Sequence, residues 1–220
     1  MSPEGISAPK QQRSRDSFAR VKAAALALLQ DPDVVEFTLA DVSRLSGASI
    51  GSIYTRVQSK SDLIRAVQME EFDRIDRAAQ TISDRADSAR DFEDAVTQIV
   101  RALIGHLVEN AAILRAFMRL SAGDEQITVR GRQSSDISEA AFITSLLNAS
   151  DRWHVGADLS AVSWCYDLIY SVVGRHLGFG IAAGGLPRDP IAPSELADRL
   201  SDTILSFLLR AGSASTKSRS

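Results

Sequence analysis

The apolar residues of this chain recur at helical spacing in almost every segment. From Arg13 onward they return every three or four positions, as in Phe18, Val21, Ala25 and Leu28, which places them on one face of a helix. In no segment is the alternation of apolar and polar residues, which is typical of a half-buried strand, stronger than this helical pattern. The chain is therefore predicted to be all-α, with about nine helices.

Polar, Pro-bearing and Gly-bearing segments divide the pattern into separate helices. Thr38 and Ser59 each stand three residues before an acid, Asp41 and Asp62, which is typical of a capping box at a helix start. Gly47 is expected to end the second helix. The predicted helices span about 13–31, 38–47, 49–56, 59–82, 92–109, 110–122, 124–149, 158–181 and 194–211.

The polar stretch "DRADSARDFED" interrupts the apolar pattern after the fourth helix and is the expected domain junction. We predict a disordered arm over 1–12, a helix-turn-helix domain over 13–63 with the fourth helix running on to about 82 as a connector, a larger helical domain over 83–211 and a disordered tail over 212–220.

Composition limits the classes of protein to consider. Apolar residues make up 45% and charged residues 24% of 220 residues, enough to bury a core. The N-terminus lacks the apolar region of a signal peptide, and no apolar run approaches the length of a membrane span, so a cytoplasmic protein without a membrane partner is expected. The single cysteine, Cys165, excludes an intramolecular disulfide and a Cys-rich zinc site. The three histidines lack acids at metal-ligand spacing, so a metal site is not expected. No cofactor is expected either.

Charge does not favour binding by electrostatics alone. Residues 1–80 hold 11 basic and 11 acidic residues, and residues 81–220 hold 14 basic and 17 acidic residues. A protein that coats nucleic acid through its charge is therefore unexpected. Binding of DNA through a small, shaped site remains open.

The stretch "LSGASIGSIYTRVQSK" has the features of such a site. Two short helices joined by a turn at Gly47 match a helix-turn-helix, whose second helix lies in the major groove. Short residues at its start allow close approach to DNA, which gives a reason for the helix-breaking Gly51. The expected DNA-contacting residues are Thr38, Ser49, Ile50, Gly51, Ser52, Tyr54, Thr55, Arg56 and Lys60. On spacing alone, an ordinary helical hairpin with a glycine turn fits equally well.

A family resemblance favours the DNA-binding interpretation. Residues from about Arg13 to Leu63 resemble the N-terminal domain of TetR-family transcriptional regulators, and the match rests on an ordered set: Thr38, Val42, Gly47, Ala48, Ser49, Gly51, Ser52, Ile53, Tyr54, Ser59, Lys60 and Leu63. It covers about a quarter of the chain. The chain departs from the family at Thr55 and Arg56, where aromatic residues are common, and at Gln58, where proline is frequent. We expect Arg56 to alter base or phosphate preference.

The resemblance implies that the larger domain dimerises through its last two helices and encloses a small-molecule pocket. Small residues at steps of three and four along 158–181 would let another helix approach closely. The expected interface comprises Ser163, Asp167, Ser171, Gly174, Gly178, Leu200, Ile204, Phe207 and Leu208. The expected pocket comprises Leu103, His106, Leu107, Leu114, Phe117, Met118, Phe142, Trp164, Tyr166 and Tyr170. A monomeric core and a purely structural His106 are the alternatives.

The leading hypothesis is thus a homodimeric regulator, most often a repressor in this family, that binds a palindromic operator on double-stranded DNA and leaves it when a small-molecule effector binds. A helical enzyme is disfavoured because the chain lacks a nucleophile elbow, a phosphate loop and a zinc-protease motif. A regulator without a ligand, or an adaptor that binds only protein, is the remaining alternative.

Overall fold

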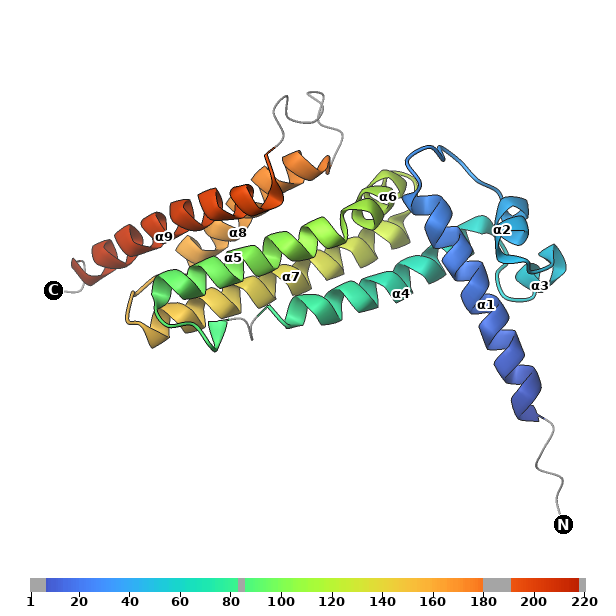
Figure 1. The fold of residues 1–220 in the computed structure, drawn as a ribbon, viewed down its shortest axis with the longest axis horizontal. Helices are drawn as coiled ribbons and strands as arrows, with labels where there is room; N and C mark the ends of the chain where they lie inside the picture. The colour runs from blue at the N-terminus through green and yellow to red at the C-terminus, as the bar shows by residue number, and fades with distance from the viewer. Residues whose placement is uncertain (1–6, 83–85, 180–190, 218–220) are drawn as a thin grey trace, which may run out of the picture. The chain divides into compact units, whose positions relative to one another are not determined.

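The computed structural model describes residues 7–82, 86–179 and 191–217, and their regular secondary structure is entirely helical (Figure 1). This confirms the all-α prediction. The nine helices of the described residues are α1 (Ser7–Gln30), α2 (Leu39–Ser46), α3 (Ile50–Tyr54), α4 (Lys60–Gln80), α5 (Phe92–Glu109), α6 (Ala111–Ser121), α7 (Glu125–Arg152), α8 (Leu159–Leu177) and α9 (Pro193–Lys217). None of the helices in these ranges is long and apolar enough to cross a membrane.

The chain forms two compact units, Met1–Glu71 and Phe72–Ser220. The division falls inside α4, whereas the sequence pattern suggested the polar stretch over 84–94. The reason is that α4 contributes to two cores. Its first half buries Leu63, Ile64 and Val67 in the first unit, and its second half starts the second unit.

The first unit is a small helical domain. In it α1 packs against α2, and α2 packs against α3. Its core is made of aliphatic and aromatic side chains from all four helices and the segments between them: Val21, Ala25, Leu29, Phe37, Val42, Ile53, Val57, Leu63 and Val67. Burial of this set orients α2 and α3, so their remaining faces meet solvent.

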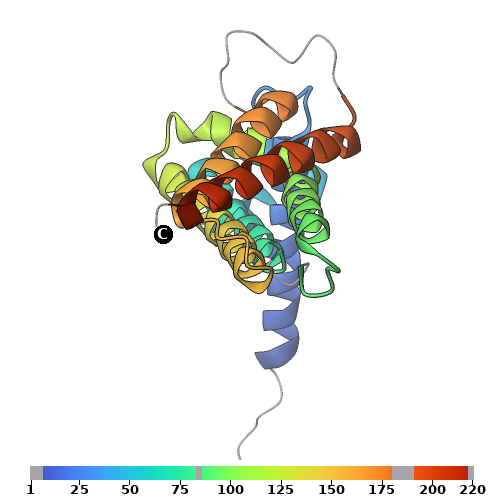
Figure 2. The ribbon, with the colours of Figure 1, turned by 90° about the vertical axis from the view of Figure 1, so that its left-hand side faces the viewer.

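The second unit is built around α5. This helix packs against α9 on one side and α7 on another, and α8 packs against both α7 and α9 (Figures 1 and 2). Ile99, Val100 and Leu103 of α5 are fully buried in this core. Cys165 of α8 is also buried there, and burial raises the pKa of its thiol to about 12, so it stays a thiol at neutral pH.

Capping residues account for where the helices of the second unit begin and end. Asp91, Asp124 and Asp158 each stand at an N-cap, where the carboxylate accepts backbone N–H groups that the helix leaves unpaired. Gly178 ends α8 in the left-handed conformation, with φ 70°, which glycine adopts without strain. The last residues of the predicted 158–181 helix lie outside the described residues.

Two terminal predictions need correction, because both end helices are longer than expected. α1 starts at Ser7, inside the predicted disordered arm, and Pro9 falls in its first turn, where a proline is tolerated. α9 continues to Lys217, inside the predicted disordered tail. Gly212 is buried against the carbonyl group of Val155, and this contact holds α9 beyond its predicted end.

A buried polar cluster fixes the second half of α4 against α7. The Arg130 guanidinium of α7 donates to the carboxylate of Asp76 at 2.7 Å and to that of Asp73 at 3.0 Å. Ser134 donates its hydroxyl to Asp76 as well. The side chains of Arg130 and Asp76 are only 11% and 12% exposed, so each compensates a charge that would otherwise be buried alone.

Replacing Arg130 by Met should therefore destabilise the protein strongly, because it keeps the bulk of the side chain and leaves the Asp76 carboxylate without its counter-ion. We expect the free energy of unfolding to fall by about 3–5 kcal/mol, measured by urea titration at a fixed protein concentration.

The matched control is Arg199→Met, which removes an exposed partner of Glu195, since those side chains are 66% and 50% exposed. It should cost less than about 1 kcal/mol. Equal losses in the two variants would contradict a structural role for the buried cluster.

Candidate nucleic-acid interface

The start of α2 is fixed by the capping box that the sequence predicts. Thr38 accepts the Asp41 N–H at 3.3 Å, and the Asp41 carboxylate accepts the Thr38 N–H at 2.8 Å and its hydroxyl at 2.7 Å. These bonds with Thr38 lower the pKa of Asp41. The Thr38 hydroxyl is already bonded to Asp41 within the cap. A contact between Thr38 and DNA would therefore have to share this hydroxyl.

The turn between α2 and α3 depends on Gly47. It adopts φ 69°, in the left-handed region, and its N–H donates to the Ser43 carbonyl at 3.0 Å. Ser43 Oγ then donates to the Ala48 carbonyl at 2.6 Å, and the Ala48 N–H donates to Ser46 Oγ at 3.2 Å. The short polar residues of the turn thus satisfy its backbone and set the direction of α3.

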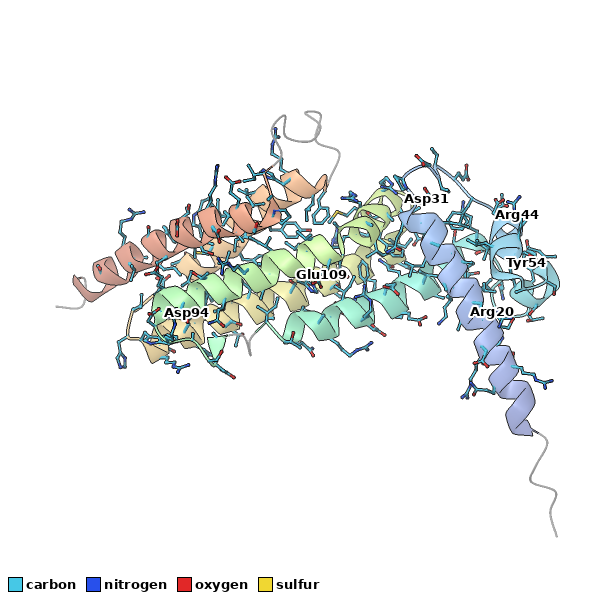
Figure 3. The ribbon with its side chains drawn as sticks, viewed as in Figure 1. Arg20, Asp31, Arg44, Tyr54, Asp94 and Glu109 are labelled. Carbon is cyan, nitrogen blue, oxygen red and sulfur yellow. The ribbon has the colours of Figure 1, made fainter. Side chains whose placement is uncertain are left out.

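α3 presents a solvent face made of small residues. Ser49 caps the helix by accepting the Ser52 N–H at 3.2 Å. Ile53 is fully buried, whereas Gly51 and Ser52 are exposed, and Tyr54 is 56% exposed. In Figure 3, Tyr54 extends from α3 into solvent, and Arg44 does so from α2. The exposed face allows close approach of a flat or grooved surface.

Arg56 has an internal partner that the sequence pattern did not indicate. Its guanidinium donates to the hydroxyl of Ser14 on α1 and lies 5.8 Å from the centre of the Phe18 ring. Thr55 Oγ1 donates to the Ser52 carbonyl at 2.7 Å. The side chains of Thr55 and Arg56 are both exposed, yet each is hydrogen-bonded within the first unit. The Arg56 bond links α1 to the residues that follow α3. Their expected contacts with DNA remain predictions.

Lys60 stands at the start of α4 beside an aromatic ring. Its ammonium lies 4.8 Å from the centre of the Phe37 ring and 3.5 Å from the carboxylate of Glu36. Ser59 caps α4 by accepting the Asp62 N–H at 3.2 Å, as the sequence predicts. These contacts hold Lys60 beside the segment that precedes α2, and a polyanion could compete with Glu36 for its charge.

The expected pocket residues fall into different surroundings. Leu103, Leu107, Phe142 and Tyr166 lie in the core of the second unit, and the Phe117 ring packs edge-on against Phe72 at 5.3 Å. Leu114 and Tyr170 pack at the edge of that core, and Met118 is partly exposed. Trp164 is 56% exposed on α8, away from the core, and His106 lines a groove against α4. The expected pocket residues therefore do not all line one pocket.

The structure also divides the expected interface residues. Leu200, Ile204 and Leu208 are buried in the core of their own chain, so they are not available to a partner, and Gly174 packs against Phe179. The exposed faces carry other members of the set: Asp167 and Ser171 are exposed, and Ser163, Gly178 and Phe207 are partly exposed. The prediction was wrong for the buried members because the apolar positions of α9 serve the core of their own chain first.

One feature of the second unit was missed by sequence reasoning. Tyr166 Oη and Ser138 Oγ are buried without a hydrogen-bond partner of normal geometry among the described residues. Burial raises the pKa of Tyr166 to about 12. The Tyr166 ring stacks on Tyr170 at 6.0 Å and lies 5.8 Å from Phe142. The run of serines in α7 was the available signal, since serine on a buried helix face needs a partner.

Within the ranges that the structure describes, no three His, Cys, Asp or Glu side chains lie close enough together to hold a metal ion.

Solved structures resemble this chain over most of its length. No protein-family model matches it, and no curated protein matches it in sequence. A protein assigned to the TetR family from Mesorhizobium loti MAFF303099 superposes with a TM-score of 0.70 at 17% identity, covering 89% of this chain and 96% of that one. A tetR-family regulatory protein from Rhodococcus RHA1 gives 0.60 at 17% identity, covering 87% and 96%.

The fatty acid degradation regulator FadR from Bacillus halodurans gives a TM-score of 0.60 at 12% identity, covering 86% of this chain and 94% of that one. These similarities show that the chain has the fold of TetR-family transcriptional regulators.

The two glycines of the motif should respond oppositely to alanine. A Cβ would meet no atom within 4 Å at either position, so backbone conformation decides. Gly47→Ala should lower the free energy of unfolding by about 1 kcal/mol, since φ 69° strains a residue with a side chain. Gly51→Ala should raise it by up to about 1 kcal/mol, because alanine favours helix.

Chemical denaturation of both variants, followed by circular dichroism, measures this difference. Shifts of the same sign would show that the turn does not need the left-handed conformation.

Proposed function

We propose that the protein is a sequence-specific DNA-binding transcriptional regulator that acts as a homodimer and represses transcription until a small-molecule ligand releases it from its operator. The observation that carries the proposal is the solvent face of α3. It combines small residues, an exposed tyrosine and a neighbouring lysine, on a fold shared with TetR-family regulators.

The size of α3 favours a dimer. Five helical residues extend about 7.5 Å, which covers only a few base pairs of a major groove. Two copies of α3 in a symmetric dimer would read two half-sites about 34 Å apart, one turn of DNA. An inverted repeat is therefore the expected operator, with Ile50, Gly51 and Ser52 nearest the bases and Tyr54 and Lys60 near phosphates.

Exposed apolar residues on α8 and α9 support a dimer face in the second unit. Trp164 of α8 is 56% exposed, and Leu209 of α9 is 47% exposed. Asp167 and Ser171 continue the exposed α8 face along the same helical stripe. Tryptophan is a frequent anchor of protein interfaces, so Trp164 is proposed as an interface residue in place of its expected role in the pocket.

The buried hydroxyls of Tyr166 and Ser138 support a ligand site between α7 and α8. The Tyr166 ring packs against those of Phe142 and Tyr170, so a ligand with an apolar body and a hydrogen-bonding group would suit this site. Such a ligand releases DNA only if it prefers the arrangement of the reading helices that DNA does not. α4 is the continuous element that contributes to both units.

The proposal is tested by selection of binding sites from randomised duplex DNA, followed by gel-shift titration at near-physiological salt. We expect an enriched inverted repeat and a specific shift with the matching fragment, including fragments upstream of the protein's own gene. Recovery of no common sequence in repeated selections would refute the proposal.

Lys60→Met should weaken binding to specific and unrelated duplexes alike, since it removes a phosphate contact without changing base readout. The slope of log affinity against log salt should fall in magnitude by about one. Fluorescence anisotropy across a salt series measures it.

Lys60→Arg keeps the charge and should keep the slope. Arg132→Met removes the charge of an exposed residue of α7 and should leave the affinity for DNA unchanged. A change at Arg132 as large as that at Lys60 would point to a general charge effect.

Trp164→Glu should convert the dimer to a monomer, because it places a charge in an apolar contact. Val129→Glu is the matched control, since Val129 is also an exposed apolar residue of the second unit, 45% exposed, on α7. Sedimentation velocity at micromolar concentration distinguishes the two. A dimer that survives Trp164→Glu would exclude this face.

A further inference from the structure

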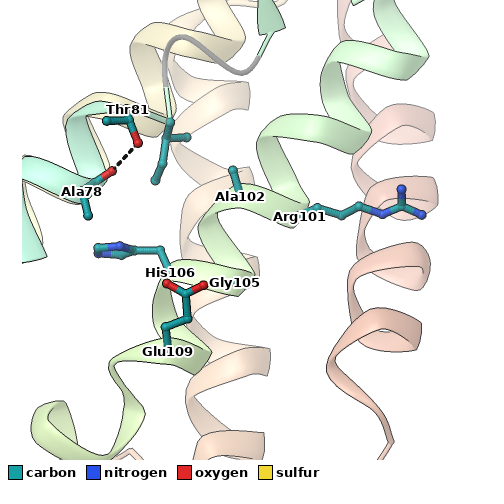
Figure 4. Close-up of a pocket in the computed structure, with 8 residues that line it drawn as sticks. Ala78, Thr81, Arg101, Ala102, Gly105, His106 and Glu109 are labelled. Carbon is teal, nitrogen blue, oxygen red and sulfur yellow. Dashed lines mark hydrogen bonds between the residues drawn. The ribbon is translucent and has the colours of Figure 1, made fainter.

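A groove runs between the end of α4 and the second half of α5, apart from the Tyr166 cluster and the face of α3 (Figure 4). Its volume is about 260 Å³, just below the usual range for sites of drug-sized ligands. Its lining shares no residue with the cluster around Tyr166. It is formed by Ala78, Thr81, Ile82, Arg101, Ala102, Gly105, His106 and Glu109.

Small side chains keep the groove open. Ala78 of α4 faces Ala102 and Gly105 of α5, and a Cβ added at Gly105 would meet no atom within 4 Å. Ile82 adds an apolar surface at one end. The space therefore suits a compact ligand with a short apolar body.

Two of the polar groups in the lining already have partners. The Arg101 guanidinium donates to the carboxylate of Asp198 on α9 at 2.7 Å, and Figure 4 shows it directed away from α4. The Thr81 hydroxyl donates to the Ala78 carbonyl at 2.8 Å. The Arg101 guanidinium is thus engaged on the side of α9, and the Thr81 proton is used by a backbone carbonyl, whereas the oxygen of Thr81 can still accept.

Two other polar groups in the lining can still form hydrogen bonds. The ring of His106 and the carboxylate of Glu109 have no hydrogen-bond partner among the described residues. His106 is 8% exposed, and its ring extends from α5 toward Ala78, with the Glu109 carboxylate on the same stretch of α5 (Figure 4). A nearly buried imidazole that lines a groove without a partner is a group that a ligand would satisfy.

The charges around His106 favour a cationic ligand. Burial is the main cause that lowers the pKa of His106, and Glu109 and Asp76 oppose this effect while Arg74 adds to it. The imidazole is therefore neutral at neutral pH and can accept a hydrogen bond. Together the carboxylate, imidazole and hydroxyl offer acceptors and a negative charge.

We propose that the groove between α4 and α5 binds a small organic cation, with its ammonium group held by Glu109 and His106 and its short apolar body against Ala102, Gly105 and Ile82. This goes beyond the proposed function, because binding here requires neither DNA nor the Tyr166 cluster. The two proposals can therefore fail separately.

The test compares three probes of equal length and different charge: n-butylammonium, n-butanol and butyrate. Binding to the full chain without DNA is followed in ¹H–¹⁵N correlation spectra at the amides of Thr81 and Ala102, at constant ionic strength. We expect saturable shifts with n-butylammonium in the millimolar range, about tenfold tighter than with n-butanol, and none with butyrate.

Variants locate the site. Glu109→Gln should remove the preference for the cation over n-butanol, because it removes the charge and keeps the shape. Glu93→Gln is the matched control, since it removes an exposed carboxylate from the first turn of the same helix, and it should leave the preference unchanged. Gly105→Leu should block all binding by filling the groove, and leucine also favours helix more than glycine.

The proposal is overturned if n-butylammonium causes no saturable shift at these amides, if the three probes bind equally, or if Glu109→Gln and Glu93→Gln behave alike. A far-ultraviolet circular dichroism spectrum and a melting temperature for each variant establish that it is folded before its binding is compared.

Discussion

The buried ion pair between Asp76 and Arg130 is the constraint on which the second unit depends, because it decides where half of α4 can lie. α4 is one unbroken helix from Lys60 to Gln80, yet its two halves are buried in different cores. A carboxylate as deeply buried as Asp76 requires its partner on α7. Whatever moves α7 therefore acts on α4 at a defined point.

The first unit follows a different physical rule. It is small, and its local geometry comes from backbone hydrogen bonds to short polar side chains: the box of Thr38 and Asp41, the αL turn at Gly47 and the cap at Ser49. These interactions act over three to five residues, so they are set by local sequence. They leave the small residues Gly51 and Ser52 exposed on α3 beside Tyr54, and this is the surface that DNA recognition would use.

The second unit contains polar groups at buried positions, where apolar residues are usual. Among the described residues, the hydroxyls of Tyr166 and Ser138 are buried without a hydrogen-bond partner of normal geometry, and the nearly buried His106 lines a groove. A protein that needed only stability would gain from apolar residues at these positions, since burying an unpaired polar group costs free energy. The two proposed ligand sites rest on these groups.

Local sequence determined the helical class, the two caps at Thr38 and Ser59, the turn at Gly47 and the surface of α3, because each depends on spacing within a few residues. Only tertiary structure decided which face of a helix meets another. Periodicity marks buried Ile204 and exposed Trp164 equally as apolar, and packing alone separates core from surface.

Outside α3, the contacts that shape the two units join distant parts of the sequence. Arg56 lies 42 positions from Ser14, and Arg130 lies 54 positions from Asp76. The groove likewise brings together the end of α4 and the second half of α5. No local pattern reports such pairings, because they depend on how whole helices pack and not on the spacing of residues within one helix.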